Sequence, residues 1–369
     1  MKVLHLLYAG LGGHGNVFFS FIKADENKQI ENEAIFAGVE PIRDEYISNC
    51  NKANIPWQSL RKRKGVDIGF SKKLLHSLRA SISSVIFLHG SRFIILAKIA
   101  VLTSSKKKKI VVRETQANHL KTGYDWMRLI ASMILADRMV FLTPVFEAEI
   151  RKKLSLIYRP NKISIVNNGI DLTFFKPAIK QANKRIILGM QSRIVSIKDH
   201  STLLKAFAIL QQDPSQLSLE LKIAGEGDLM PALKLLAKEL QIDNKVQFTG
   251  VLNEDDLLHF LHGIDIYVHA SMGETMSTAI MQAMACRLTV IASDVPGINN
   301  MIEHNKTGVL IPVKNEAALA NAILYIIDNP TKANAMAQAA YSHALLNFSS
   351  KTMFAKYVSL FEGSNKINR

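Results

Sequence analysis

Short apolar runs alternate with longer amphipathic stretches along the first half of the chain. The runs of strand length are KVLHLLY, EAIFAGV, SVIFLHG, KIVVRET, RMVFLT and KISIVNN. Short apolar runs separated by helical patterns are typical of a parallel sheet whose two faces are both covered. The first half therefore predicts a doubly wound α/β domain.

A second series of the same kind follows NNGIDLTFFKP, whose Asn, Gly and Pro predict a linker. Its predicted strands are RIILGMQ, LELKIAG, KVQFTG, DIYVHA, LTVIAS and GVLIPV. Apolar residues at helical spacing between them occur in DHSTLLKAFAILQQ, GDLMPALKLLAKELQI and TMSTAIMQAMAC. We expect two Rossmann-like domains that face each other, with the ligand in the cleft at the carboxyl ends of the strands.

The length of the chain fits this division. At 369 residues it is long enough for two domains, and 48% hydrophobic with 21% charged residues is typical of a globular protein. We place the first domain at 1–178 and the second at 179–345. The chain is predicted to be helical from about residue 315 to its end, and the last segment is 346–369.

Neither a signal peptide nor a membrane-spanning helix is expected. The opening MKVLHLLYAGLGGHG passes into glycines, which predicts a first strand. The apolar stretch 85–102 is interrupted by His89, Arg92 and Lys98. Two cysteines at unrelated positions favour a reducing compartment, so a cytoplasmic location is predicted.

The positive charge lies almost entirely in the first half. Residues 1–178 hold 28 Lys and Arg against 14 Asp and Glu, and residues 179–369 hold 18 against 17. The cations cluster in RKRK, KK, KKKK and RKK, and each Lys or Arg near an acidic membrane contributes about 1 kcal/mol. This asymmetry favours an anionic membrane surface over solvated loops. Nucleic acid ranks lower, because the clusters lack interleaved aromatic residues and no known reading motif occurs.

The stretch from residue 269 to 297 carries the candidate chemistry. A helix that starts near Thr275 presents unpaired N–H groups and a partial positive charge to an anion. The hydroxyls of Ser277 and Thr278 lie in the same turn. Glu274 and Gln282 then lie two turns apart, about the span from a sugar across a diphosphate to a ribose. An amphipathic helix with a capping acid and an incidental Gln is the alternative.

Loops after other predicted strands add groups suited to a diphosphate. Arg193 and Lys198 follow RIILGMQ, where a guanidinium fork and an ammonium group neutralise negative charge. Backbone that approaches a ligand closely is predicted in two glycine-containing loops, which contribute Gly12, Gly13, Gly225 and Glu226.

These motifs, in this order, resemble the retaining GT-B glycosyltransferases of the GT4 family, of the type that builds bacterial cell-envelope polysaccharides. The resemblance rests on GGHGN, NNGIDLTFFKP, SRIVSIKDHSTLLKAF, IAGEGDL, VQFTGVL, DIYVHASMGETMSTAIMQAMA and DVPGINNMIEHNKTGVLIP. It implies a nucleotide-sugar domain after residue 178, an acceptor-binding domain before it, and a terminal helix that crosses back to the first domain. No obligatory metal or cofactor is implied.

The resemblance also implies roles for individual residues. Arg193 and Lys198 hold the leaving diphosphate, Glu274 contacts the transferred sugar, and the backbone around Val251 meets the base. The donor is expected to be a UDP-sugar by family habit. Thr275 and Met276 complete the donor-binding loop.

The sequence departs from the family pattern in three places. Gln282 stands where the family has a second Glu that binds the ribose, which predicts weaker nucleotide binding because charge-assisted bonds are lost. The usual Gly and Pro after that motif are Arg287 and Thr289. The His that often follows the strand matched by KIVVRET is absent there, so the candidates on the acceptor side are His14, His89, Glu114 and His119.

The expected reaction is front-face substitution, in which the leaving diphosphate takes the proton of the acceptor hydroxyl. The acceptor is expected to be a lipid-linked or cell-envelope glycan at the inner face of the cytoplasmic membrane. Two alternatives stay open at this point: an epimerase acting on a nucleotide sugar with the same fold, and a catalytically weak protein that binds nucleotide sugars.

Overall fold

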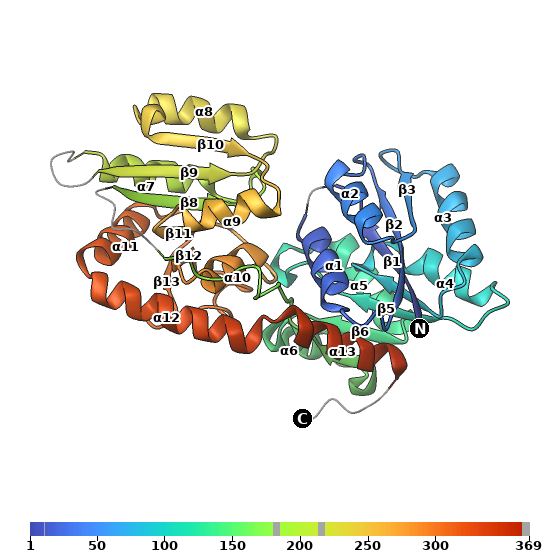
Figure 1. Cartoon of the computed structure of the whole chain (residues 1–369). Helices are drawn as coiled ribbons and strands as arrows, with labels where there is room; N and C mark the ends of the chain where they lie inside the picture. Colours follow the sequence, from blue (N-terminus) through green and yellow to red (C-terminus); the bar gives the residue numbers. More distant parts are fainter. Residues whose placement is uncertain (11, 180–184, 213–217, 364–369) are drawn as a thin grey trace. The chain divides into compact units, whose positions relative to one another are not determined.

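The computed structural model describes residues 1–10, 12–179, 185–212 and 218–363. The chain forms two compact units: unit 1 is Met1–Asp171 together with the segment from Ser350, and unit 2 is Leu172–Ser349 (Figure 1). The first division falls inside the predicted linker, before the boundary placed at 178/179. The second falls after the boundary placed at 345/346, because the Ser350 N–H already donates to the Ile170 carbonyl of unit 1, at 2.9 Å.

Unit 1 is built on a seven-stranded parallel sheet with the order β3-β2-β1-β4-β5-β6-β7. Its strands are β1 (Lys2–Tyr8), β2 (Glu31–Gly38), β3 (Trp57–Arg61), β4 (Val85–Leu88), β5 (Lys109–Arg113), β6 (Arg138–Phe141) and β7 (Ile163–Ile165). Six of them coincide with predicted strands. The seventh, β3, was missed because it lies at the sheet edge and Leu60 alone is buried, so no apolar run marks it.

Helices cover both faces of this sheet. They are α1 (Gly13–Ala24), α2 (Asp44–Lys52), α3 (Ile68–Ala80), α4 (Ile94–Leu102), α5 (Gly123–Leu135), α6 (Pro144–Lys153) and α13 (Ser350–Glu362), with short 3₁₀ turns η1 (Ser91–Phe93), η2 (Asn118–Leu120) and η3 (Pro160–Lys162). Alternate residues of each strand point to opposite faces. Ile86 and Leu88 pack with α3, α4 and α5, whereas Val85 and Phe87 pack with α1 and α13. This two-sided burial explains the unbroken apolar runs.

The last described helix, α13, completes the core of unit 1. The Phe354 ring lies 4.9 Å from that of Phe21 in α1, and the Tyr357 ring lies 5.0 Å from that of Phe87 in β4. All four rings are buried. Residues 364–369, the end of the predicted segment 346–369, lie outside the described residues.

A row of largely buried polar side chains crosses the same face of the sheet. His5 Nδ1 lies 3.1 Å from His89 Nε2, and His5 Nε2 lies 2.9 Å from Asn32 Oδ1. Burial lowers the pKa of His5 to about 4 and holds the pKa of His89 well below its ordinary value. Both rings are therefore neutral at pH 7. The buried Arg113 guanidinium donates to the Asn168 side chain.

Unit 2 repeats the architecture with a six-stranded parallel sheet of order β10-β9-β8-β11-β12-β13. Its strands, all predicted, are β8 (Ile186–Gln191), β9 (Leu219–Ala224), β10 (Val246–Gly250), β11 (Ile266–His269), β12 (Thr289–Ser293) and β13 (Val309–Ile311). Its helices are α7 (His200–Leu210), α8 (Met230–Glu239), η4 (Asp243–Lys245), α9 (Glu254–His262), α10 (Thr278–Ala285), α11 (Glu316–Asp328) and α12 (Pro330–Asn347). The apolar sides of α7, α8 and α11 share one core cluster with the strands.

Removing the Phe354 ring is expected to destabilise unit 1 by about 3–5 kcal/mol, since Phe354→Ala leaves a cavity among buried aromatic side chains. Both tryptophans of the chain, Trp57 and Trp126, lie in unit 1, so tryptophan fluorescence during urea unfolding reports on this unit alone. Lys351→Ala on the exposed side of the same helix serves as the control and should leave the transition almost unchanged. Equal midpoints for both variants would contradict the packing role of α13.

Unit 1 should also lose stability as the pH falls from about 6.5 towards about 4. In this window His5 and His89 take up protons in the unfolded chain and not in the folded one, so each lowers the free energy of unfolding by up to about 1.4 kcal/mol per pH unit. The double variant His5→Gln, His89→Gln should flatten this dependence. His76→Gln, which alters an exposed histidine of α3, is the control. The measurement is urea unfolding followed by tryptophan fluorescence at several pH values.

Candidate functional site in unit 2

The candidate site lies where the order of the strands in unit 2 reverses direction. β8 and β11 are neighbours in the sheet, and the chain leaves β8 towards β9 on one side and reaches β11 on the other. At such a switch point the loops after the two strands diverge and leave room for a ligand. Arg193 and Lys198 follow β8, and His269 is the last residue of β11.

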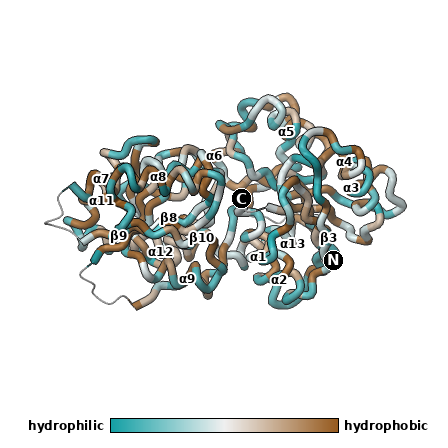
Figure 2. The backbone as a smooth tube through the Cα atoms, turned by 90° about the horizontal axis from the view of Figure 1, so that it is seen from above, coloured by the Kyte–Doolittle hydropathy of each residue, from teal (hydrophilic) through white to brown (hydrophobic). Residues whose placement is uncertain are grey.

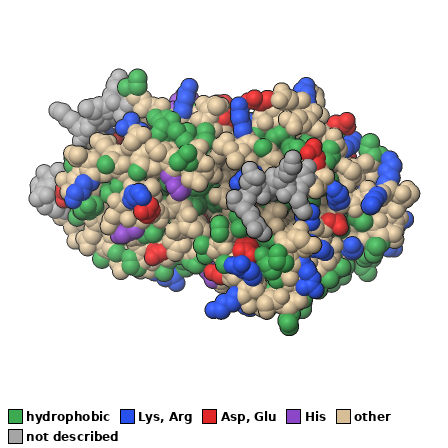
Figure 3. Space-filling view, turned by 90° about the horizontal axis from the view of Figure 1, so that it is seen from below, with side chains coloured by type: hydrophobic (Ala, Val, Ile, Leu, Met, Phe, Trp, Pro, Cys, Tyr) green, Lys and Arg blue, Asp and Glu red, His purple; other side chains and the backbone are tan. Residues whose placement is uncertain are grey.

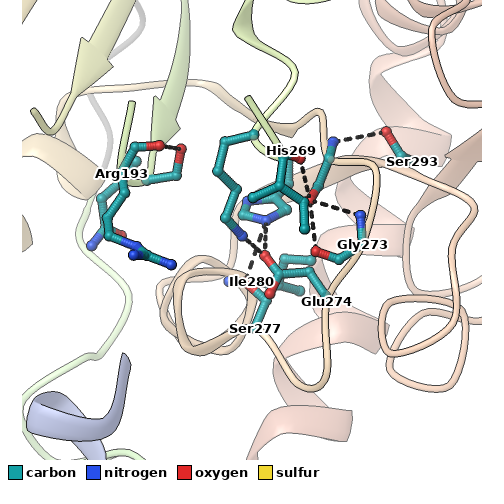
Figure 4. Close-up of polar contacts among 12 residues, drawn as sticks. Arg193, His269, Gly273, Glu274, Ser277, Ile280 and Ser293 are labelled. Carbon is teal, nitrogen blue, oxygen red and sulfur yellow. Dashed lines mark hydrogen bonds and ion pairs between the residues drawn. The ribbon is translucent and has the colours of Figure 1, made fainter. Parts of the chain in front are cut away.

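Four side chains meet there, which we call the Lys198 cluster: Lys198, His269, Glu274 and Ser277. Figure 4 labels the last three of them. The Lys198 ammonium group forms an ion pair with Glu274 Oε1, and His269 Nε2 lies 2.8 Å from the same oxygen. The Ser277 hydroxyl lies 3.5 Å from His269 Nε2. The exposed fractions of the Lys198 and Glu274 side chains are 12% and 14%, so the pair is largely shielded but still reachable.

His269 fixes the position of the Glu274 carboxylate. Burial, reinforced by the charge of Lys198, holds the pKa of His269 well below its ordinary value, so the imidazole is neutral. A carboxylate only accepts hydrogen bonds, so Nε2 carries the hydrogen and donates it to Glu274. On the other side of the ring, Nδ1 lies 3.2 Å from the Tyr267 hydroxyl. The ring is therefore held from both ends.

A second cation lies beside the cluster. Arg193 comes from the same loop as Lys198, and its guanidinium points towards the cluster (Figure 4). Burial lowers the pKa of the Lys198 ammonium group, and the charge of Arg193 lowers it further. Each of two neighbouring cations makes the charged form of the other less stable, and an anion placed between them stabilises both charged forms. The site is therefore suited to a ligand that carries more negative charge than Glu274 alone supplies.

Close backbone contacts hold the loops of the site together. Gly225, with φ +132°, lies so near the Ser192 carbonyl that a Cβ at this position would collide with it. Gly297, with φ +92°, lies equally close to the carbonyl of Glu274. The loops after β8 and β11 are also joined directly, since the Met272 N–H donates to the Ile197 carbonyl at 2.8 Å. The acid and the two cations therefore project from a rigid backbone.

The helix after β11 begins later than predicted. Ser277 is the N-cap of α10, and its hydroxyl accepts from the Ile280 N–H at 3.4 Å. The predicted start near Thr275 was wrong, and Glu274 and Gln282 do not lie two turns apart on one helix, because Glu274 belongs to the preceding loop. Serine is among the preferred N-cap residues, and its side chain here satisfies an N–H of the first turn.

The other predicted donor-side residues of unit 2 are distributed over α10 and the loops after β9, β10 and β11. Gln282 is 4% exposed, and its Oε1 atom has no hydrogen-bond partner among the described residues. Val251 follows β10 and is partly buried, and Glu226 is exposed on the loop after β9. The structure thus places Gln282 in the interior with an unused acceptor. The remaining predicted residues, Thr275, Met276 and Thr278, lie between Glu274 and the first turn of α10.

The predicted site residues of unit 1 are spread over several elements. Glu114 follows β5 and is buried; it accepts from the Ser91 hydroxyl at 2.7 Å and pairs with Lys121 at 3.5 Å. His89 lies in the buried row described above, and His119 is exposed on η2. The Gly12 carbonyl accepts the Gly15 N–H at the start of α1, and the next residue is Gly13. The half-buried His14 ring stacks edge-on against Tyr8.

Sequence reasoning did not single out His269. His269 ends an apolar strand five residues before Glu274, and this position in the sequence is the signal by which it could have been found. Arg113 ends β5 and is 2% exposed. No group of three or more His, Cys, Asp or Glu side chains arranged to hold a metal ion occurs in the part of the chain that the structure describes.

Part of the chain matches a known protein family. Residues 172–343 match the family model described as Glycosyl transferases group 1. A D-inositol 3-phosphate glycosyltransferase of Thermobispora bispora is 27% identical over 226 residues, which cover 57% of this chain and 52% of that protein. The chain therefore spans about half the length of the curated relatives it matches.

Solved structures resemble the whole chain. Alr3699/HepE of Anabaena, crystallised with UDP and glucose, superposes with a TM-score of 0.81 at 17% identity, covering 98% of this chain and 99% of that one. The lipopolysaccharide outer core galactosyltransferase WaaB superposes with a TM-score of 0.69 at 15% identity, again covering 98% and 99%.

These likenesses confirm the predicted GT-B fold with its two parallel-sheet α/β domains. The family match falls entirely within unit 2, the unit that carries the Lys198 cluster. Residues 172–343 thus resemble the glycosyl transferases group 1 family.

Proposed function

We propose that the protein is a retaining glycosyltransferase of the GT4 type that moves a sugar from a UDP-sugar to a lipid-linked or cell-envelope glycan. The observation that carries the proposal is the Lys198 cluster with Arg193 beside it, at the switch point of a group 1 domain. Transfer is favoured over epimerisation because the named relatives are glycosyltransferases. The transferred sugar is a hexose or an N-acetylhexosamine.

The two cations receive the diphosphate of the donor. Arg193 offers a planar fork of N–H donors and Lys198 a compact charge, which together suit two linked phosphates. The partly buried site strengthens both interactions, since less water screens them. When the diphosphate binds, Lys198 exchanges part of its contact with Glu274 for phosphate oxygens. Glu274 is then available to accept hydrogen bonds from the hydroxyls of the sugar.

His269 acts on the sugar through Glu274. Its Nε2–H bond keeps one carboxylate oxygen in place, and the second oxygen faces the ligand. We regard His269 as a positioning residue, because its ring contacts Glu274, Tyr267 and Ser277. Gln282 offers its unpartnered Oε1 to a hydroxyl of the ribose, and the backbone near Val251 meets the base.

The chemistry follows from this arrangement. The acceptor hydroxyl oxygen bonds to the anomeric carbon on the face from which the diphosphate departs, so the configuration is retained. The proton of the hydroxyl passes to an oxygen of the leaving diphosphate. Arg193 and Lys198 stabilise the negative charge that develops there, and fixed charges of this kind commonly supply the largest part of catalysis.

The acceptor side is assigned to unit 1. Its excess of positive charge fits a lipid-linked substrate at the inner face of the cytoplasmic membrane, where anionic lipids are exposed. WaaB, which shares the fold, is named for a lipopolysaccharide substrate. No helix among the described residues has both the length and the apolar character needed to cross a bilayer.

A panel of nucleotide sugars, incubated with the purified protein in the presence and absence of membrane lipid extract, tests the proposal. Release of nucleoside diphosphate that requires the extract, with the sugar recovered on a lipid, is expected. Isomerised donor would replace the proposal by an epimerase. Binding without turnover would replace it by a protein that only binds nucleotide sugars.

Lys198→Ala should lower kcat at least tenfold, because removing one preorganised donor commonly costs about 2.7–4 kcal/mol of transition-state stabilisation. Steady-state kinetics with the donor identified by the panel measure the effect. Lys205→Ala is the matched control, since Lys205 is exposed on α7 of the same unit. A Lys198→Ala protein with normal turnover would remove Lys198 from the mechanism.

Gln282→Glu should bind UDP several times more tightly. A carboxylate makes charge-assisted bonds to the ribose hydroxyls, roughly twice as strong as those of an amide. Calorimetry with UDP measures the gain, and a 2′,3′-dideoxy analogue should not show it, because that analogue lacks the hydroxyls. If the variant and the original protein bind UDP equally well, Gln282 does not contact the ribose.

A further inference from the structure

Helix α4 has no polar face although it lies at the surface of unit 1. Its sequence is IILAKIAVL, in which Lys98 is the sole polar residue. It packs beside α3 and α5 on one side of the sheet (Figure 2). Ile94, Ala97 and Ala100 belong to the buried core cluster on that side. A surface helix of a globular protein normally carries polar residues on its outer side.

The outer side of α4 is instead a stripe of large apolar residues. Ile95, Ile99 and Leu102 are 53%, 39% and 72% exposed. They are spaced four and three residues apart, so they lie on one face of the helix. Single exposed apolar residues are common, but three in line along one helix indicate contact with an apolar medium. We call them the α4 stripe.

The stretch of sequence that contains the α4 stripe is rich in positive charge, although α5, which packs beside α4, carries Asp125. Between Asp67 and Glu114 the sequence has ten Lys and Arg and no Asp or Glu. Of the ten, Lys108 and Arg113 are buried, which leaves eight at least partly accessible. Arg92 lies just before α4, and Lys106 and Lys107 lie just after it; all three are exposed. Figure 3 shows Lys and Arg side chains among apolar ones on the side of unit 1 turned to the viewer.

We propose that the α4 stripe docks unit 1 onto an anionic lipid bilayer. Ile95, Ile99 and Leu102 enter the boundary between headgroups and acyl chains, and Arg92, Lys106 and Lys107 lie against the anionic headgroups. A bilayer is the partner that offers both an apolar layer and a dense negative surface to one helix face. The choice of a membrane as partner rests on the proposed function, but the docking residues follow from their exposure and charge.

Other occupants fit the surface less well. Nucleic acid offers phosphates but no apolar layer, and the α4 stripe has no aromatic side chains on which bases stack. A second copy of this chain would bring a second set of cations to the same face, and like charges repel. The bilayer therefore accounts for both features of the surface.

Sedimentation with vesicles tests the proposal on the full chain. Vesicles of phosphatidylglycerol with phosphatidylcholine should bind the protein, and vesicles of pure phosphatidylcholine should bind it at least tenfold more weakly. Raising the salt concentration should weaken the binding to the anionic vesicles, because the charges are screened. The triple variant Ile95→Ser, Ile99→Ser, Leu102→Ser should lose at least tenfold in affinity at either salt concentration.

A charge variant separates the two contributions. Lys106→Gln with Lys107→Gln should lose about 30-fold at low salt, which corresponds to about 1 kcal/mol per cation, and the loss should shrink at high salt. The matched controls lie on α8 of unit 2, where Leu235 is 58% exposed and Lys234 and Lys238 are also exposed. Leu235→Ser and Lys234→Gln with Lys238→Gln should bind vesicles like the original protein.

The outcomes are distinct. Vesicle binding that survives the triple variant, or that neither variant reduces more than its α8 control, would overturn the proposal. So would a dimer, detected by analytical ultracentrifugation, that the triple variant abolishes. Urea unfolding followed by tryptophan fluorescence, which reports on unit 1, should give the same midpoint for the α4 variants as for the original protein, which shows that unit 1 is folded. A protein that binds vesicles but transfers no sugar contradicts the proposed function and leaves the docking surface standing.

Discussion

Burial of both faces of each parallel sheet is the constraint on which the rest of this structure depends. A strand covered on both sides has no room for chemistry along its length, so polar side chains collect where the strands end. In unit 2 this brings Lys198 and Glu274 together across 76 positions of sequence. The reactive groups are few, and their positions follow from the order of the strands.

The same constraint explains how much of the fold could be predicted. Strands buried on both faces read as continuous apolar runs, and twelve of the thirteen strands were found in this way. β3 was not predicted because it is an edge strand with a single buried side chain, and such a strand shows no run of apolar residues in the sequence. The start of α10 was misplaced because Thr275, Ser277 and Thr278 all suit a helix start, and the choice of Ser277 depends on a side-chain hydrogen bond.

The types of residue in the candidate site could be predicted from the sequence, but the contacts between them could not. Arg193, Lys198 and Glu274 follow strands and carry charge, so the sequence points to them. His269 contacts the same oxygen of Glu274 as Lys198 does, yet a neutral histidine at the end of an apolar strand resembles a core residue. Its role depends on burial, which keeps the ring uncharged, and on Tyr267, which holds its far side. Neither the burial of the His269 ring nor its contact with Tyr267 can be read from the amino-acid sequence.

Unit 1 consists of two separate stretches of sequence, so it is complete only after the second stretch has been synthesised. The aromatic residues of α13 close the core over β1, β4 and α1, but they are made after the whole of unit 2. Domains generally fold as they leave the ribosome. Unit 2 can therefore fold while Phe21 and Phe87 of unit 1 still lack their partners from α13, and the core of unit 1 is completed only when translation has passed α13.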